Sequence, residues 1–229
     1  MAALDLNADL GEEVTDDEGL LALVTSANVA CGYHAGNAEI MRRVCAEAVR
    51  RGVTIGAQVS YADRENFGRI PREVPLAVLR EQVADQVGVL SEIAASEGGA
   101  VGYVKPHGAL YHRVIDDAEQ AGAVLSGSAA LPLLGMGGAV ILSMAAQAGR
   151  RTFLEGFPDR AYTSAGRLVP RGEPHALVED SSAIAANAVR LAARVDSVCV
   201  HGDSPDAVAH ARAVRRALLA ADYVLRPFA

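Results

Sequence analysis

The segment LDLNADLGE, residues 4–12, alternates apolar and polar side chains along almost its whole length. A period of two places Asp5, Asn7 and Asp9 on one face of a strand, and leucine and alanine side chains on the other. Carboxylates that point into a protein interior need partners, because an unpaired buried charge is costly. The segment therefore predicts an interior strand whose polar face is an acid–base or cation-binding floor. The alternative is a polar network that only ties loops together.

Short apolar runs recur along the chain, and amphipathic helical patterns separate them. The runs cover residues 3–8, 27–31, 53–57, 100–104, 139–143, 152–154 and 197–200. One helical pattern follows Asn37, which we expect to cap its N-terminus, and ends at Gly52 as a C-terminal cap. Strands that alternate with helices indicate a parallel sheet that is covered on both faces.

Polar residues follow nearly every apolar run, and their distribution separates two architectures. They are Asp5, Asn7, Asp9, Asn28, His34, Gln58, Lys105, His107, Glu155, Asp159, Arg160, His201 and Asp203. An open doubly wound sheet concentrates its site at one switch point, whereas a β/α barrel gathers residues from many strand ends into one mouth. The pattern therefore predicts a distorted or incomplete β/α (TIM-like) barrel of about seven strands, in a single domain over residues 1–229.

The composition excludes several classes of function. With 229 residues and 51% hydrophobic content, the chain can bury one sizeable core. Its 28 acidic and 21 basic residues give a net charge of −7, which argues against nucleic acid or an anionic membrane as the main partner. The sequence contains no run of 18 apolar residues and shows no secretory signal, so we expect a soluble cytoplasmic protein. Three cysteines without CxxC spacing argue against a disulfide framework or a structural zinc knuckle.

Lys105 is the only lysine among the 21 cationic residues. Arginine is a planar, permanently charged fork, whereas lysine is compact and can lose its proton, so a lone lysine indicates a position where arginine would not serve. Strand alternation gives Lys105 and His107 the same facing, about 7 Å apart. An ammonium beside an imidazole can hold an anionic oxygen or supply a proton. We therefore predict a functional role for Lys105.

The loops after two other strands carry further candidates. His34 lies in a glycine-rich turn, which suits chemistry better than a helix face does. Arg64 and Arg69 are predicted to form an anion clamp. The alternative is that both are surface arginines paired with Asp63 and Glu65.

Two absences narrow the chemistry. The sequence contains no GxxxxGK[ST] phosphate-binding loop and no HExxH or CxxC metal motif. Asp5, Asp9, His34 and His107 could still assemble a metal site in space, and the sequence leaves this open. His112 is expected to be an ordinary surface or loop histidine.

Six motifs, taken in order, resemble the LamB/YcsF family. They are LDLNADLGE, SANVACGYHAG, SYADRENFGR, VKPHGALYH, FPDRAY with LVPR, and VCVHGD, and together they span the chain from about residue 4 to the last helical pattern. The resemblance implies a β/α barrel of the glycoside hydrolase/deacetylase type. It also implies the A subunit of a 5-oxoprolinase, which opens the lactam 5-oxo-L-proline to L-glutamate with ATP and Mg²⁺, together with partner subunits B and C.

The resemblance and the residue chemistry together suggest roles. Glu155 or Asp9 is expected to act as general base, and Lys105 and His107 to stabilise developing negative charge. Arg69 or Arg160 is expected to hold the substrate carboxylate. Substrate-binding roles are predicted for Asp5, Asn7, His34, Gln58, Arg69, Asp159, Arg160, His201 and Asp203.

The chain departs from the family pattern at several positions. Gln58 replaces the histidine of GAHPS, Asn37 replaces the aspartate of HAGD, and Glu13 replaces the last glycine of DLGEG. The segment between residues 180 and 197 is also shorter than in typical members of the family. These changes support one alternative, a diverged paralogue that binds a lactam without catalysis. A second alternative is a stand-alone metal-dependent amide hydrolase or deacetylase. The sequence leaves open whether the chain binds a metal and whether it forms a homo-oligomer.

Overall fold

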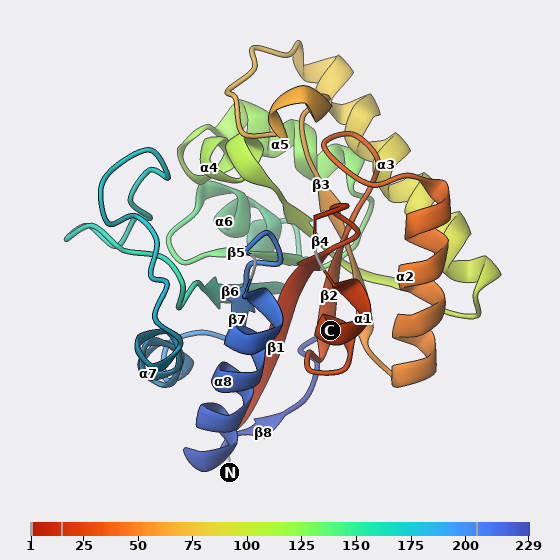
Figure 1. Cartoon of the computed structure of the whole chain (residues 1–229). Helices are drawn as coiled ribbons and strands as arrows, with labels where there is room; N and C mark the ends of the chain where they lie inside the picture. Colours follow the sequence, from red (N-terminus) through yellow and green to blue (C-terminus); the bar gives the residue numbers. More distant parts are fainter. Residues whose placement is uncertain (1, 15, 205) are drawn as a thin grey trace.

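The computed structural model describes residues 2–14, 16–204 and 206–229 (Figure 1). Within these residues, seven parallel strands form a closed barrel in the order β2-β3-β4-β5-β6-β7-β1, because β1 also pairs with β2. They are β1 (Ala3–Leu10), β2 (Ser26–Ala30), β3 (Thr54–Val59), β4 (Val101–Pro106), β5 (Leu133–Met136), β6 (Thr152–Gly156) and β7 (Ser197–Val200). A short strand, β8 (Val224–Leu225), pairs with Ala3 and Leu4. The predicted barrel of about seven strands is confirmed.

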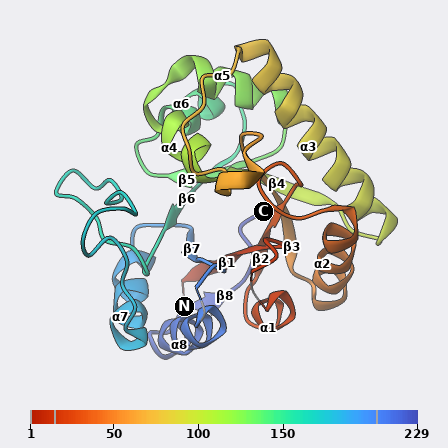
Figure 2. The same ribbon diagram turned by 45° about the horizontal axis from the view of Figure 1, so that its top comes forward.

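Helices surround the strands, as Figure 2 shows. They are α1 (Asp17–Leu21), α2 (Ala38–Arg51), η1 (Arg64–Asn66), α3 (Leu76–Ser96), α4 (Gly108–Asp116), α5 (Ala118–Gly127), α6 (Val140–Gln147), α7 (Ser181–Ala192) and α8 (Ala207–Ala220). The predicted caps of α2 are confirmed: the Asn37 side chain accepts the N–H of Ile40, and Gly52 adopts the left-handed conformation with φ of 68°. Among the described residues, no helix is both long and apolar enough to cross a membrane.

The predicted strand over residues 139–143 is wrong, because these residues lie at the start of α6. The corresponding strand, β5, lies earlier in the chain and has only four residues. Helix α6 buries Ile141, Leu142 and Ala145, which is one face of a helix. A short apolar run is compatible with a strand or with a buried helix, and here the contacts of the folded chain decided between them.

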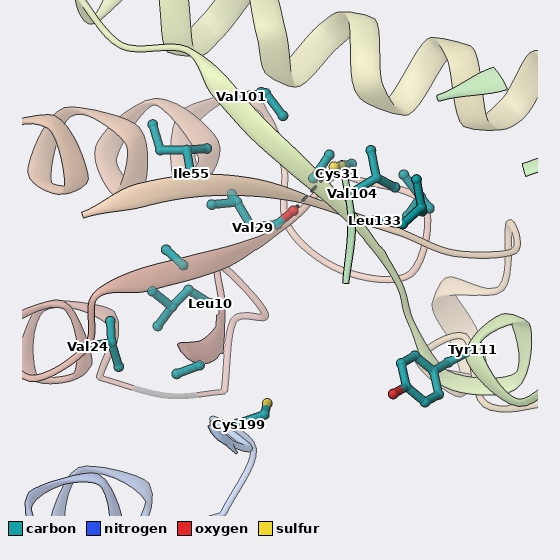
Figure 3. Close-up of a cluster of buried hydrophobic side chains, with 14 of the residues drawn as sticks. Leu10, Val24, Val29, Cys31, Ile55, Val101, Val104, Tyr111, Leu133 and Cys199 are labelled. Carbon is teal, nitrogen blue, oxygen red and sulfur yellow. Dashed lines mark hydrogen bonds between the residues drawn. The ribbon is translucent and has the colours of Figure 1, made fainter. Parts of the chain in front are cut away.

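Apolar side chains on the outer face of the strands form the core beneath the helices. Leu6 and Leu10 of β1 are completely buried there. Figure 3 shows part of this cluster, with Val29, Ile55 and Val104 on the successive strands β2, β3 and β4. These positions follow the period of two in the sequence, so the polar positions between them must face the barrel interior.

The barrel interior is polar at the start of β1. Asp5 is 1% exposed, and its carboxylate accepts hydrogen bonds from Thr25 (2.6 Å), Ser26 (2.6 Å) and Ser197. Burial raises the pKa of Asp5 to about 6, although the three hydroxyl donors oppose this shift. At this depth the polar face of β1 ties neighbouring strands together.

The network continues towards the C-terminal end of β1. The Asn28 amide donates to Asn7 (2.7 Å) and to Asp9 (2.8 Å), and the Tyr103 hydroxyl donates to Asn28 (2.6 Å). Gly56 leaves the space that the Tyr103 ring fills, since a Cβ at residue 56 would lie 2.2 Å from that ring. One connected set of hydrogen bonds therefore leads along the barrel towards its mouth.

Phe228 covers the opposite end of this interior. Its ring lies against Tyr103, with 4.8 Å between centroids, and against Phe153, with 4.5 Å. The Arg151 guanidinium donates to the Phe228 carbonyl oxygen at 2.9 Å. These contacts place an aromatic plug beneath the polar network.

Candidate functional site

A pocket of about 440 Å³ opens where the barrel strands end. Its lining residues are Asp9, Arg69, Lys105, Pro106, His107, Gly108, Ala109, Tyr111, His112, Phe157, Arg160, Leu168, Pro170, Arg171 and His201. The loop of residues 157–180, between β6 and α7, supplies several of them and extends to the left in Figure 1. The barrel thus gathers the ends of several strands into one mouth, as the sequence predicted.

Lys105 lies at the base of this pocket, between two carboxylates. Its Nζ atom is 3.0 Å from Asp9 Oδ1 and 3.1 Å from Glu155 Oε2, and it donates to Cys199 Sγ at 3.2 Å. The Lys105 side chain is 3% exposed. Strands β4, β1, β6 and β7 each contribute one member of this cluster.

The pKa values of the two acids in this cluster shift in opposite directions. Burial alone would lower the pKa of Lys105. The charge of Asp9 and the smaller contributions of Cys199 and Glu155 instead raise that pKa well above its usual range. Burial opposes ionisation of Asp9 as well, yet the Lys105 charge brings the Asp9 pKa well below its usual range. For Glu155 burial outweighs Lys105, so its pKa is raised. The ammonium and the Asp9 carboxylate are therefore a buried ion pair, and Glu155 is the acid more readily protonated.

His201, just after β7, is oriented by Asp159. Its Nδ1 lies 2.8 Å from Asp159 Oδ2, and its backbone N–H donates to the same oxygen at 3.1 Å. The ring stacks on Phe157, with 5.1 Å between centroids. Burial acts to raise the pKa of Asp159, but the charge and the hydrogen bonds of His201 outweigh it and lower that pKa. An ionised Asp159 that accepts Nδ1–H leaves Nε2 of the imidazole able to exchange a proton.

Arginines surround the pocket, but they are engaged differently. Arg69 pairs with Asp203, and Arg171 lies 3.5 Å from the same carboxylate. Arg160 donates to two carbonyl oxygens of its own loop, at 2.6 Å and 3.3 Å, and so holds the loop in place. Arg64 lies elsewhere and pairs with Glu13. The predicted clamp of Arg64 with Arg69 is therefore wrong, because the two arginines that share a carboxylate, that of Asp203, are Arg69 and Arg171.

A second buried cluster lies beside His107. The Gln58 amide nitrogen lies 2.9 Å from Glu12 Oε1 and donates to it, and it lies 2.9 Å from His107 Nδ1. The His34 ring stacks on His107, with 4.0 Å between centroids. The His34 Nε2 is 3.8 Å from Glu12 Oε1. All four side chains are buried.

The structure brings most of the sequence-predicted residues together. Those lining the pocket are Asp9, Arg69, Lys105, His107, Arg160 and His201. Those in direct contact with a lining residue are Glu155, Asp159, Asp203, Gln58 and His34. Asp5 and Asn7 are not among the residues that line the pocket. They lie deeper in the barrel, where their hydrogen-bond partners are hydroxyl and amide groups.

Sequence reasoning missed several residues of this region, among them Glu12, His112, Phe157 and Arg171. Glu12 follows the polar strand face but had no assigned role, and Arg171 and Phe157 lie on the long loop. His112 was expected to be an ordinary surface histidine, yet it lines the pocket mouth. A signal was present for His112: helix α4 begins immediately after His107, so residues one turn later face the same mouth.

Comparisons with known proteins agree with this architecture. The LamB/YcsF family model matches residues 4–229. The 5-oxoprolinase A subunit from Streptomyces avermitilis is 51% identical over 249 residues, covering 99% of this chain and all of that protein. The corresponding protein from Mycobacterium avium is 47% identical over 251 residues, with full coverage of both.

Solved structures give the same result for the fold. The lactam utilization protein from Thermus thermophilus is 35% identical, with a TM-score of 0.92 over 99% of this chain and all of that one. A family 4 carbohydrate esterase from Streptomyces lividans is 10% identical, with a TM-score of 0.57 over all of this chain and 93% of that one. This second likeness concerns the barrel alone.

Proposed function

The chain belongs to the LamB/YcsF family, and on that premise we propose that it is the A subunit of an ATP-dependent 5-oxoprolinase. In this proposal it opens 5-oxo-L-proline to L-glutamate together with partner subunits B and C. The observation that carries the proposal is Lys105, a buried ammonium at the base of a small pocket, with Arg69 and Arg171 on its wall. Such a pocket suits a small anionic molecule whose reacting oxygen gains negative charge.

The chemistry explains why ATP and further subunits are needed. A lactam resists water because its amide is stabilised by resonance, and transfer of a phosphoryl group from ATP, with Mg²⁺, to the lactam oxygen activates the ring carbon. We assign that transfer to the partner subunits, since this sequence has no phosphate-binding loop motif. Water then adds to the ring carbon, and the carbon–nitrogen bond breaks as nitrogen takes a proton. A second water releases phosphate from the resulting acyl phosphate, which leaves glutamate.

Residues that line the pocket, and two that contact its lining residues, can be given roles in that sequence. Glu155 takes the proton of the attacking water, since its raised pKa makes it a better base than Asp9. His201, oriented by Asp159, gives a proton to the departing nitrogen. Lys105 stabilises the negative charge that develops on an oxygen bound to the ring carbon. Asp9 keeps the ammonium charged and in place.

The test is release of glutamate and ADP from 5-oxo-L-proline, measured with this chain alone and with subunits B and C. Release of both products only in the complete mixture would support the proposal. Lys105→Ala should then reduce turnover at least a hundredfold, because the sequence contains no other lysine that could replace the ammonium. Wild-type turnover by that variant would refute the assigned role.

Gln58 favours one competing function, a lactam-binding paralogue without catalysis. Its amide occupies the space between Glu12 and His107, and an amide does not ionise near neutral pH, so it cannot act as a general acid or base. If this chain is inactive while a relative with histidine at this position is active, the paralogue is favoured, and activity gained by Gln58→His would identify the cause. Glutamate release without ATP or partners would instead indicate a stand-alone amide hydrolase.

A further inference from the structure

Three metal-ligating side chains converge beside the pocket. Glu12, His34 and His107 each offer one ligand atom, and the three atoms lie within 4.8 Å of one another. Glu12 Oε1 is 3.8 Å from His34 Nε2 and 3.6 Å from His107 Nδ1. Bonds of about 2.0–2.1 Å at tetrahedral angles place zinc ligands about 3.3 Å apart, so shifts of a few tenths of an ångström would complete the geometry at the two pairs with Glu12. The two histidine nitrogens lie within 4.8 Å of each other and would have to approach as well.

His34 gives an independent reason to expect a ligand here. Its side chain is completely buried, and neither ring nitrogen has a hydrogen-bond partner among the described residues. Buried polar groups are nearly always satisfied, and an orphaned one is costly. The Nε2 atom faces Glu12, so an ion between these two residues would give Nε2 the partner that it lacks.

His107 is held in the tautomer that a metal ligand needs. Its Nε2 lies 3.1 Å from the carbonyl oxygen of Phe67, and a carbonyl oxygen only accepts, so Nε2 carries the proton. The lone pair of Nδ1 therefore points into the cluster, towards Glu12 and Gln58. Metal-ligating histidines usually donate their second N–H to such an oxygen, which fixes the ring.

Gln58 completes the arrangement. Its amide nitrogen now bridges Glu12 and His107, whereas its Oε1 atom is buried and has no hydrogen-bond partner among the described residues. Rotation of the amide by 180° would exchange the two atoms and turn the oxygen towards the cluster. An ion would thus gain a fourth, weaker ligand.

From these observations we propose that Glu12, His34 and His107 bind one divalent transition-metal ion, of which Zn²⁺ is the best match, with the Gln58 amide oxygen adjoining it. Two imidazole nitrogens and one carboxylate oxygen are a ligand set that zinc takes at sites with an open position. His107 lines the pocket, so the ion lies at the pocket wall. His107 is then a metal ligand in place of the direct charge stabilisation expected from sequence.

The experiment uses the full chain without a histidine tag, stripped with a chelator, and titrated with Zn²⁺ by calorimetry. Co²⁺ is titrated in parallel, because its visible absorption reports coordination by nitrogen and oxygen. We expect one ion per chain. Affinity should fall at least tenfold in His34→Ala and in Glu12→Gln, and it should be unchanged in His112→Ala, which removes a pocket histidine outside the cluster.

Gln58→His provides a second test that removes no ligand. An imidazole is a stronger ligand than an amide oxygen, so Zn²⁺ affinity should rise at least tenfold. Less than one-tenth of an ion per wild-type chain would overturn the proposal, as would wild-type affinity in a folded His34→Ala. If the ligand variants do not fold, unchanged affinity in Gln58→His would overturn it instead. These measurements use no substrate and no partner, so their failure is distinct from failure of the 5-oxoprolinase proposal.

Discussion

At the scale of single residues, Lys105 neutralises two acids that would otherwise be buried without a cation. Breaking such a cluster by removing one partner costs more than replacing the whole cluster. We expect Lys105→Met to lower the free energy of unfolding by about 3–5 kcal/mol, measured by urea denaturation. Adding Asp9→Asn and Glu155→Gln should recover part of that loss. A loss below about 1 kcal/mol in Lys105→Met would show that the ammonium does not compensate these carboxylates.

Asp5 predicts a pH dependence of stability that is opposite in sign to that of a salt-bridged acid. Its pKa is about 6 in the folded chain, against 3.8 ordinarily, because burial disfavours the charged form. Between these values the folded chain holds a proton that the unfolded chain has lost, so this group makes the protein less stable as pH rises from about 4 to above 6. Relative to Asp5→Asn, the wild type should lose roughly 2–3 kcal/mol over that range. Urea midpoints at pH 4.5 and 7.5 measure this, and parallel curves for the two proteins would contradict it.

At the scale of elements, Arg167 and Arg171 of the loop of residues 157–180 have different partners. Arg171 lines the pocket beside Asp203, whereas Arg167 pairs with Asp116 outside it. Arg171→Ala should raise the KM for an anionic lactam about tenfold, the loss of one charge-assisted hydrogen bond, with a smaller effect on kcat. Arg167→Ala is the matched control and should leave KM unchanged. Equal effects of the two substitutions would show that the loop acts only as a whole.

Elements with strong local signals could be predicted from the sequence, and the others could not. Helix α2 has an amphipathic pattern with Asn37 and Gly52 at its ends, so its limits followed from local chemistry. Strand β5 has four residues and no polar residue at its end, and the longer apolar run after it was mistaken for the strand.

In the candidate site, too, only the residues with a local sequence signal could be predicted. Lys105 and His201 follow strands directly, and parallel strands bring their ends together, so their meeting was predictable. Arg171 reaches the pocket through the path of a long loop, and the pairing of Glu12 with His34 depends on the turns after two different strands. No local pattern specifies such paths, so these contacts could not be derived from the sequence.

At the scale of the whole molecule, Phe228 closes the barrel end that lies opposite the pocket. Phe228→Ala would open a gap beneath Tyr103 and let water reach the polar network. Since the Phe228 side chain is only partly buried, we expect a loss of about 1–3 kcal/mol in the free energy of unfolding. Leu219→Ala, at an exposed leucine of α8, should cost under about 0.5 kcal/mol. Equal urea midpoints for the two variants would show that the plug contributes nothing.

The burial of Lys105 leaves the side chains of the folded chain almost inert to reagents that acylate primary amines. It carries the sole side-chain amine of the sequence, and only 3% of that side chain is exposed. An activated ester could reach it only through the pocket, where the ion pair with Asp9 keeps the amine protonated and unreactive. Mass gained at this one residue would therefore report access to the base of the pocket, with no engineered probe and no background from other lysines. The same property would defeat coupling to a solid support through lysine side chains.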